Sequence, residues 1–121
     1  MSRRRSAPSK RLPGGVTALR GRATVFAALG DETRLRLIAV LCAGGAFSIA
    51  QLTAGTDITR QAVTKHLQVL AEAGLVRDVK VGRERLWEFE PTRIEEARRS
   101  LELIARQWDH ALLRLKHAVE S

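Results

Sequence analysis

The sequence is poor in several residue types, and each shortage excludes a class of protein. Among 121 residues there is one cysteine, Cys42, so no disulfide can form within the chain, and we expect a reducing, cytoplasmic compartment. Aromatic residues make up only 4%, which argues against a deep aromatic ligand pocket. No apolar run approaches the roughly 18 residues of a membrane span, and no apolar segment follows the N-terminal arginines, so neither a membrane protein nor a secretory signal is expected.

Acidic residues are missing from the start of the chain. The formal net charge is +8, but residues 1–20 hold six basic residues and no acidic one, whereas the rest holds 15 basic and 13 acidic residues. Residues 1–16 are also rich in serine, proline and glycine, and such a segment buries too little apolar surface to become ordered. We expect a flexible basic N-terminal tail over residues 1–16, suited to a polyanion or simply to solubility, and one folded domain over residues 17–121.

Hydrophobic periodicity predicts two helices in the first third of the chain. The first is expected over about residues 17–29. Asp31 is a good N-cap for the second, because its carboxylate can accept hydrogen bonds from the first-turn N–H groups, and Gly44–Gly45 ends it. The inward stripe of this second helix is expected to comprise Leu35, Ile38, Leu41 and Cys42, with Cys42 acting as a small buried apolar residue.

Two further helices are predicted before Gly74. Ser48 and Gln51 have the spacing of a capping box at the start of a short helix, in which Ile49 and Leu52 face inward. Thr59 is placed to cap the next helix, which Gly74 ends. That helix buries apolar residues at i, i+4 and i+7, namely Val63, Leu67 and Leu70.

The spacing of apolar residues along the chain changes twice after Gly74. Alternating residues around Gly82 predict a β-hairpin over about residues 75–90 that turns near Gly82–Arg83, and Pro91 ends it. From Thr92 onward a helix is predicted, with apolar residues three and four apart over almost four heptads. These heptad residues are Ile94, Ala97, Leu101, Ile104, Trp108, Ala111, Leu115 and Ala118.

This order of elements is typical of a winged helix-turn-helix, a mainly α fold with a small β-hairpin. In that fold the start of the second helix of the pair enters the DNA major groove. Arginine and glutamine suit guanine and adenine edges, and threonine and lysine suit phosphates or a thymine methyl. The predicted DNA-binding residues are therefore Arg60, Gln61, Thr64, Lys65 and Gln68 on the helix, and Lys80, Arg83 and Arg85 on the hairpin.

Simpler explanations exist for the same residues. The polar helix face could be merely solvated, and the basic hairpin tip could serve solubility. His66, which lies beside the core-facing Leu67, is expected to pack and hydrogen-bond at the junction of helix and hairpin rather than to contact bases.

Four segments resemble successive parts of the arsenic-repressor (ArsR/SmtB) family of bacterial winged-helix regulators. They are "FAALGDETRLRLIAVL", "SIAQLTAG", "ITRQAVTKHLQVLAEAGLV" and "VGRERLWEFEP", and the resemblance spans about residues 22–120. The most specific part runs from Val63 through His66 to Val76. Thr64 stands where many members have serine, and Trp87 where many have tyrosine. The resemblance implies a homodimeric transcriptional repressor paired through its first and last helices.

The heptad helix also favours a dimer, because one long amphipathic helix in so small a chain is best buried by its twin. Packing against the first helix of the same chain is the alternative for some turns. The expected interface residues are Val25, Phe26, Leu101, Ile104, Trp108, Leu112 and Leu115.

Metal sensing, which the family name suggests, is not expected. The short helix at residues 48–55 lacks the paired cysteines of the family's thiolate sensors. His117 and Glu120 match half of the family's zinc pattern, but Ile104 and Arg106 stand where its aspartate and histidine belong. No catalytic arrangement of residues is visible either, and we predict no enzymatic activity and no cofactor.

The predicted function is sequence-specific regulation of transcription, most simply repression by a homodimer bound to a palindromic double-stranded operator. A nucleoid-type or RNA-binding winged helix without sequence specificity is the alternative, and a protein–protein module using only the heptad helix is a third. The sequence indicates no small-molecule effector, operator sequence or regulated gene.

Overall fold

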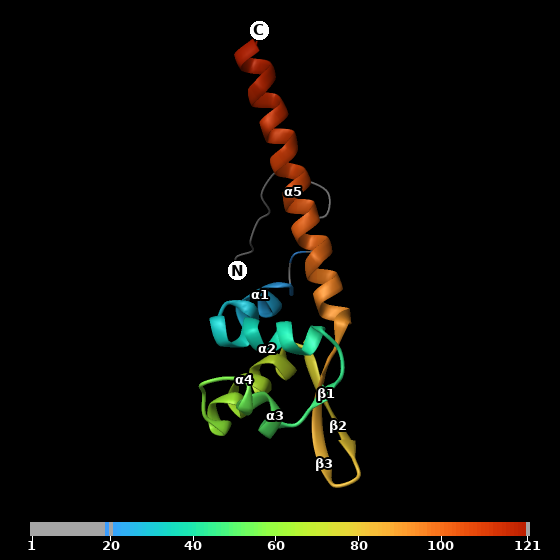
Figure 1. The fold of residues 1–121 in the computed structure, drawn as a ribbon. Helices are drawn as coiled ribbons and strands as arrows, with labels where there is room; N and C mark the ends of the chain where they lie inside the picture. Colours follow the sequence, from blue (N-terminus) through green and yellow to red (C-terminus); the bar gives the residue numbers. More distant parts are fainter. Residues whose placement is uncertain (1–18, 20, 121) are drawn as a thin grey trace, which may run out of the picture.

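The computed structural model describes residues 19 and 21–120, and the expected tail over residues 1–16 lies outside them. Five helices and three strands follow one another in the described part (Figure 1). Their order and bounds are α1 (Ala23–Leu29), α2 (Glu32–Cys42), β1 (Ala46–Phe47), α3 (Ile49–Ala54), α4 (Arg60–Glu72), β2 (Val76–Val81), β3 (Glu84–Phe89) and α5 (Pro91–Glu120).

The predicted helix caps are present. The Asp31 side chain accepts a hydrogen bond from the Arg34 N–H at the start of α2, and Thr59 accepts one from the Ala62 N–H at the start of α4. Ser48 and Gln51 form both hydrogen bonds of a capping box. Each cap pairs a backbone donor that the first turn of a helix otherwise leaves without a partner, so these residues fix where α2, α3 and α4 begin.

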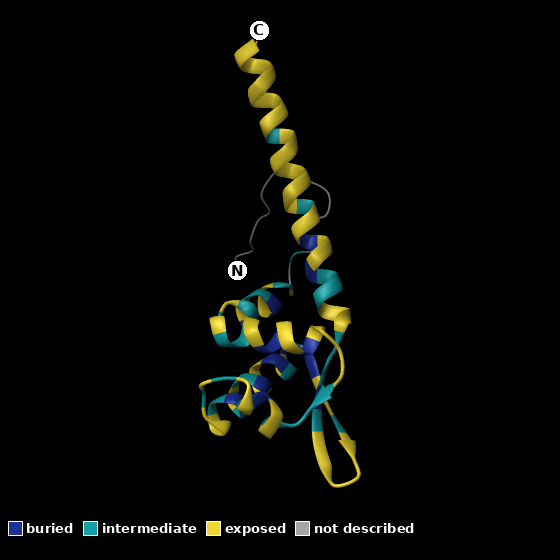
Figure 2. Cartoon of the chain, viewed as in Figure 1, coloured by how far each residue is buried: buried dark blue, intermediate teal, exposed yellow. Residues whose placement is uncertain are grey.

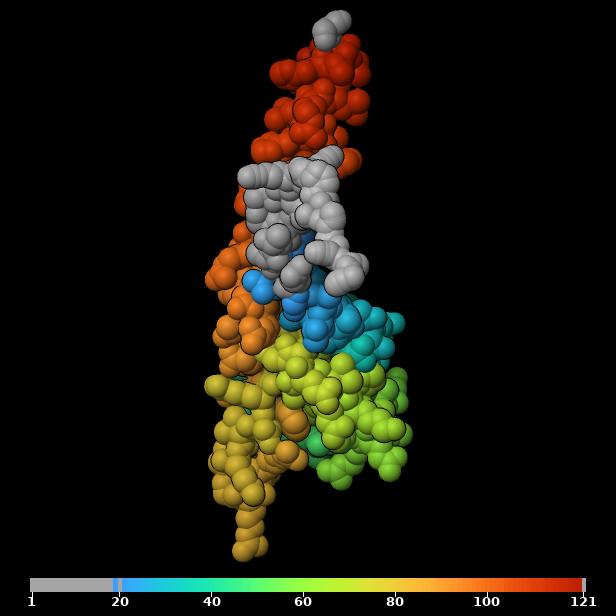
Figure 3. All heavy atoms as spheres, turned by 180° about the vertical axis from the view of Figure 1, so that it is seen from behind, coloured from blue at the N-terminus to red at the C-terminus, as the bar shows by residue number. Residues whose placement is uncertain are grey.

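The hairpin has the predicted turn. Val81 pairs with Glu84, which leaves Gly82 and Arg83 as a two-residue turn, and Gly82 adopts a φ of 63° that glycine tolerates best. Seen from behind, the β2–β3 hairpin, or wing, projects beyond the helices at the end of the molecule opposite the tip of α5 (Figure 3). The helices α3 and α4 together with this wing form the predicted winged helix-turn-helix.

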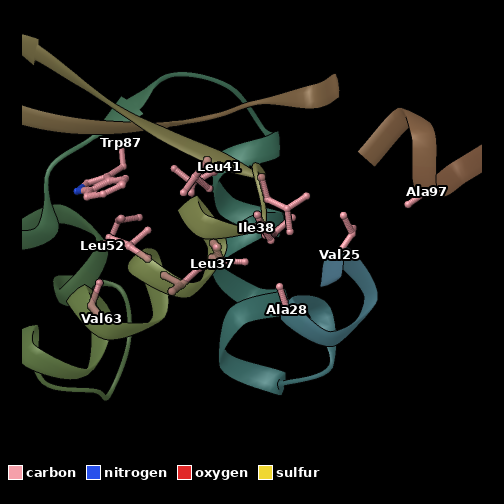
Figure 4. Packing of buried hydrophobic residues seen from close by; sticks show 14 residues of the cluster. Val25, Ala28, Leu37, Ile38, Leu41, Leu52, Val63, Trp87 and Ala97 are labelled. Atoms are coloured by element: carbon pink, nitrogen blue, oxygen red, sulfur yellow. The ribbon is translucent and has the colours of Figure 1, made fainter. Parts of the chain in front are cut away.

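The core lies where α1, α2, α3, α4 and β3 meet (Figure 4). Leu67 and Leu70 of α4 have no exposed surface, and Trp87 of β3 covers the same cluster. Val25 of α1 and Ala97 of α5 are also buried, so the first turns of α5 are attached to the body through α1. Burial of this kind positions α4 firmly, because each fully buried leucine contributes about 1.5–3 kcal/mol to folding.

Beyond its first turns α5 stands free of the body (Figure 2). Its 30 residues correspond to about 45 Å of helix. Nevertheless, no helix in the described part of the chain is both long and apolar enough to cross a membrane.

Three expectations about the first half of the chain were wrong. The first helix begins at Ala23 rather than near residue 17, since Gly21 has a φ of 84°, outside the helical region. The hairpin is part of a three-stranded sheet of order β1-β3-β2, because Ala46–Phe47 pairs with Glu88 and Trp87. A two-residue strand is too short to show alternation of apolar and polar residues, so β1 has no recognisable sequence pattern.

The third error concerns the buried face of α2. Leu37, Ile38 and Leu41 form that face, whereas Leu35 is 51% exposed and Cys42 is exposed. The helix is rotated by about one residue relative to the prediction, which counted Leu35 and Cys42 as inward and omitted Leu37. Desolvation still raises the pKa of the Cys42 thiol above its ordinary value, so this thiol stays protonated at neutral pH.

Candidate nucleic-acid interface

The five polar residues predicted on α4 lie together. They line one shallow hollow on the surface of the helix, which we call the α4 hollow: Arg60, Gln61, Thr64, Lys65 and Gln68. Four of them are exposed, whereas Thr64 is half-buried and its hydroxyl donates to the Arg60 carbonyl at 2.8 Å. Val63, Leu67 and Leu70 on the inner side of α4 are fully buried, so the α4 hollow is the polar face that this helix turns away from the core.

The charge of the α4 hollow is uncompensated by its own chain. Within the described residues, Arg60, Lys65 and Gln61 take part in no ion pair or side-chain hydrogen bond, while most arginines of the body do. Two cations and two amides with free donors match phosphate oxygens and the acceptor-rich edges of the major groove. The hollow can therefore bind a duplex without first breaking intramolecular contacts.

A brace holds α4 in position. The Nδ1 atom of His66 lies 3.4 Å from an Arg34 guanidinium nitrogen and 4.0 Å from an Asp31 oxygen. Arg34 also donates from Nε to the Ala28 carbonyl at 2.5 Å, which ties the end of α1 to the start of α2. The expected packing role of His66 is present, but its partner is the start of α2 and not the wing.

The same contacts explain the titration of Asp31. Its pKa is lowered below the ordinary value of 3.8, mainly by the hydrogen bond from the Arg34 backbone and further by the charge of Arg34. A carboxylate whose pKa is lowered by folding stabilises the folded state at pH values above its unfolded-state pKa. This stabilisation is lost as the pH falls through the pKa of the folded state. The Asp31 carboxylate therefore stays ionised, and the cap of α2 intact, throughout the neutral range.

The wing presents its predicted basic residues in two different ways. Lys80 and Arg83 are exposed, and neither has a partner among the described residues. Arg85 instead donates from Nε to Asp78 at 2.7 Å and lies 5.5 Å from the centre of the Trp87 ring. Lys80 and Arg85 are directly paired across the strands, so they share the face of the sheet that carries the buried Trp87.

Asp78 is a residue of the interface that the sequence reasoning missed. The hydrogen bond from Arg85 is the main cause of the pKa of Asp78 being lowered below 3.8, so this carboxylate is ionised at neutral pH. A signal was available, because a two-residue turn at Gly82–Arg83 fixes the register and places residue 78 diagonally opposite residue 85. The brace residue Arg34 gave no comparable local signal.

The predicted interface residues on α5 form a second exposed surface. Leu101, Ile104, Trp108, Leu112 and Leu115 are all exposed, and Trp108 is 62% exposed. We call them the α5 stripe. By contrast, Val25 is only 3% exposed and Phe26 is half-buried in the core of the same chain, so α1 offers less surface than α5.

Comparisons with known proteins agree with this geometry. A family model described as a helix-turn-helix domain matches residues 29–79, which contain α2, α3 and α4. The HTH-type transcriptional regulator Rv2034 of Mycobacterium tuberculosis is 34% identical over 94 residues, which cover 78% of this chain and 84% of that protein. An ArsR-like transcriptional regulator from Rhodococcus sp. RHA1 superimposes with a TM-score of 0.76 at 38% identity, covering 88% of this chain and 96% of the other.

The chain belongs to the ArsR family of helix-turn-helix transcriptional regulators. The family resemblance expected from the sequence is thereby confirmed. The arsenical resistance operon repressor of Escherichia coli is a more distant relative, with 34% identity over 59 residues that cover 49% of this chain and 50% of the repressor. In this ArsR-family regulator the matched segment carries the α4 hollow, whereas the α5 stripe lies outside the family model.

Proposed function

We propose that this ArsR-family regulator is a transcriptional repressor that binds a palindromic DNA operator as a homodimer. The observation that carries the proposal is the α4 hollow, in which five polar residues meet at the solvent face of α4 and all but Thr64 have side chains without a partner among the described residues. The E. coli relative is named as a repressor, which favours repression as the direction of regulation.

Each part of the interface has a proposed role. Arg60 and Gln61 at the first turn of α4 read bases in the major groove, and Thr64, Lys65 and Gln68 contact the backbone or a thymine methyl. Lys80 and Arg83 at the wing reach a flanking minor groove, where the negative potential is strongest in narrow A·T tracts. Arg85 contacts DNA as well only when its hydrogen bond to Asp78 is broken.

The homodimer is proposed to form through the α5 stripe. The five exposed residues of the stripe leave a contiguous apolar surface along α5 from Leu101 onward, which a second copy can cover. Two-fold pairing would present two α4 hollows one helical turn of DNA apart, roughly 34–36 Å. Occupying such an operator within a promoter would exclude the transcription machinery.

The proposal is tested by selecting bound duplexes from random DNA with the full chain and then titrating salt. We expect an inverted-repeat sequence to be enriched and to bind about 10³-fold or more tighter than random DNA at physiological salt. Enrichment of no sequence, with equal affinity for all duplexes, would instead support the non-specific nucleic-acid-binding alternative.

Freeing Arg85 should strengthen DNA binding. In Asp78→Asn the acidic partner is replaced by a neutral side chain of similar size, so Arg85 becomes available to phosphate and one negative charge leaves the interface. We expect operator affinity to rise about three- to tenfold and the salt dependence to steepen by about one unit of slope. Affinity measured across a range of salt concentrations checks this.

Glu88→Gln is the matched control for Asp78→Asn. Glu88 pairs with Arg77 at 2.8 Å on the opposite face of the same sheet. An equal rise in affinity for both variants would mean that the wing senses only net charge and that the Asp78–Arg85 pair has no specific role.

Metal ions are expected to leave DNA binding unchanged. In the described residues no three histidine, cysteine, aspartate or glutamate side chains are grouped closely enough to hold a metal, and Cys42 is the only cysteine. Zn(II), Cd(II) and As(III) in modest excess should therefore not shift the operator titration. Stoichiometric zinc binding by calorimetry, coupled to release of DNA, would contradict this.

A further inference from the structure

A cavity lies between α2 and α3, beside Phe47 of β1. Its volume is about 370 Å³, within the range of roughly 300–1,000 Å³ that is typical of small-molecule sites. The surface of this α2–α3 cavity is mostly apolar. It is lined by Arg36, Leu37, Ala39, Val40, Phe47, Gln51, Leu52, Gly55 and Thr56.

The apolar lining leaves groups exposed that a folded protein would ordinarily cover. Val40 is 43% exposed although it is a large aliphatic residue facing the cavity. Phe47 packs against the core with one side and lines the cavity with the other. A ligand with an apolar body would remove this surface from water, which is the main source of affinity in such sites.

Arg36 and Gln51 supply hydrogen-bond donors among the cavity residues, whereas the Thr56 hydroxyl already donates to the Leu52 and Thr53 carbonyls. Gln51 uses its Oε1 atom to accept from the Ser48 N–H at 2.8 Å, which leaves its Nε2 group free to donate. Arg36 pairs with Glu32 at 2.7 Å, but its side chain is 63% exposed and such exposed pairs contribute little. The Arg36 guanidinium can therefore turn to an anion, and no acidic residue lines the cavity to oppose one.

We propose that the α2–α3 cavity binds a small organic acid with a compact apolar body, such as an aryl or medium-chain carboxylate. The apolar body would lie against Val40, Phe47 and Leu52, and the carboxylate would accept hydrogen bonds from Arg36 and from Nε2 of Gln51. Arg36 and Gln51 both supply donors and no acidic residue lines the cavity, so an anion is favoured over an amine.

The cavity lies at the joint that carries the DNA-reading helix. Its α3 side packs on α4, and its α2 side belongs to the scaffold that the Arg34–His66 brace connects to α4. A ligand at this joint contacts both elements whose relative position sets the orientation of α4. This coupling to DNA rests on the proposed function, whereas ligand binding itself does not.

The binding test uses the full chain without DNA. Backbone amide shifts are recorded by two-dimensional NMR while 2-naphthoate, octanoate or the neutral 2-naphthylmethanol is added. We expect saturable shifts confined to residues 36–56 for both acids, and binding of the alcohol to be roughly tenfold weaker or more, because it loses the charge-assisted hydrogen bond. Shifts centred on the α5 stripe, or none, would overturn the site.

Variants separate the cavity from its surroundings. Ala39→Phe adds a ring at an exposed position that lines the cavity and should weaken 2-naphthoate binding at least tenfold, while Ala50→Phe, on the exposed side of α3, should not. Arg36→Gln should bring the affinity for 2-naphthoate down to that for 2-naphthylmethanol. Unchanged binding in Ala39→Phe refutes the cavity as the site. Unchanged binding in Arg36→Gln refutes Arg36 as the partner of the carboxylate, and equal binding of 2-naphthoate and 2-naphthylmethanol refutes the acid as the ligand class.

A second measurement addresses DNA. With the selected operator, saturating 2-naphthoate should change the affinity of the parent at least threefold and that of Ala39→Phe not at all. An unchanged operator affinity despite proven ligand binding would overturn the coupling alone. A chain that binds 2-naphthoate but no DNA would refute the proposed function and leave the ligand site standing.

Discussion

Trp108→Glu is expected to convert the protein to a monomer and to lower its affinity for a palindromic operator by about 10²-fold or more. Trp108 is the largest side chain of the α5 stripe and lies mid-way along it, where an aromatic anchor contributes most to an interface. A charge at that position would be buried without a partner in the dimer. A monomer binds one half-site only and loses the avidity of the second.

The structure makes this substitution a clean test. Trp108 is largely exposed in the single chain and contacts no part of the core, so its loss should not unfold the monomer. Sedimentation and circular dichroism together would show a folded monomer. His110→Glu, which adds the same charge two residues away and off the heptad positions, is the matched control and should stay dimeric. A folded, tightly dimeric Trp108→Glu variant would place the interface elsewhere, on α1 around Phe26.

Arg60→Ala and Gln61→Ala should each cost roughly 1–3 kcal/mol of operator binding, which is about five- to 150-fold. Both residues lie in the first turn of α4 and line the α4 hollow without intramolecular partners. If they read bases, the loss should fall mainly on the preferred operator and leave random DNA nearly unaffected. Parallel gel-shift titrations on operator and on random DNA would distinguish a loss specific to the operator from a loss common to all DNA.

Two further variants make this result interpretable. Lys65→Ala should weaken binding to all sequences alike and reduce the salt slope by about one, as expected for a phosphate contact. Arg106→Ala removes a positive charge from an exposed site on α5 and should change neither the affinity for DNA nor the salt slope. Equal losses for Arg60→Ala and Arg106→Ala would mean that only net charge matters and that α4 does not enter the groove.

Much of the fold was predictable because it depends on neighbours in the sequence. The caps Asp31, Ser48 and Thr59 act on backbone groups within three residues, and the Gly82–Arg83 turn joins adjacent strands. The polar face of α4 follows from the 3.6-residue period of a helix, so the sequence alone predicts that the five residues of the α4 hollow lie together. The exposure of the α5 stripe is consistent with the same kind of reasoning.

What escaped prediction depends on residues that are distant in the chain. The β1 strand exists only because residues 46–47 pair with residues 87–88 of β3. His66 contacts Arg34, which lies 32 positions away in the sequence. The rotation of α2 that exposes Leu35 and Cys42 is decided by which side packs on α4 and β3, since several faces of that helix are apolar. Local periodicity cannot choose between such faces.

The sequence by itself therefore determined the helices, the hairpin, the helix caps and the polar character of one face of α4. Only the tertiary structure decided that Arg85 is held by Asp78, that Val25 is buried within its own chain and that a cavity remains between α2 and α3. The reason is physical: periods and caps are set by covalent spacing along the backbone, whereas ion pairs across strands, burial and cavities result from packing between elements that the spacing does not specify.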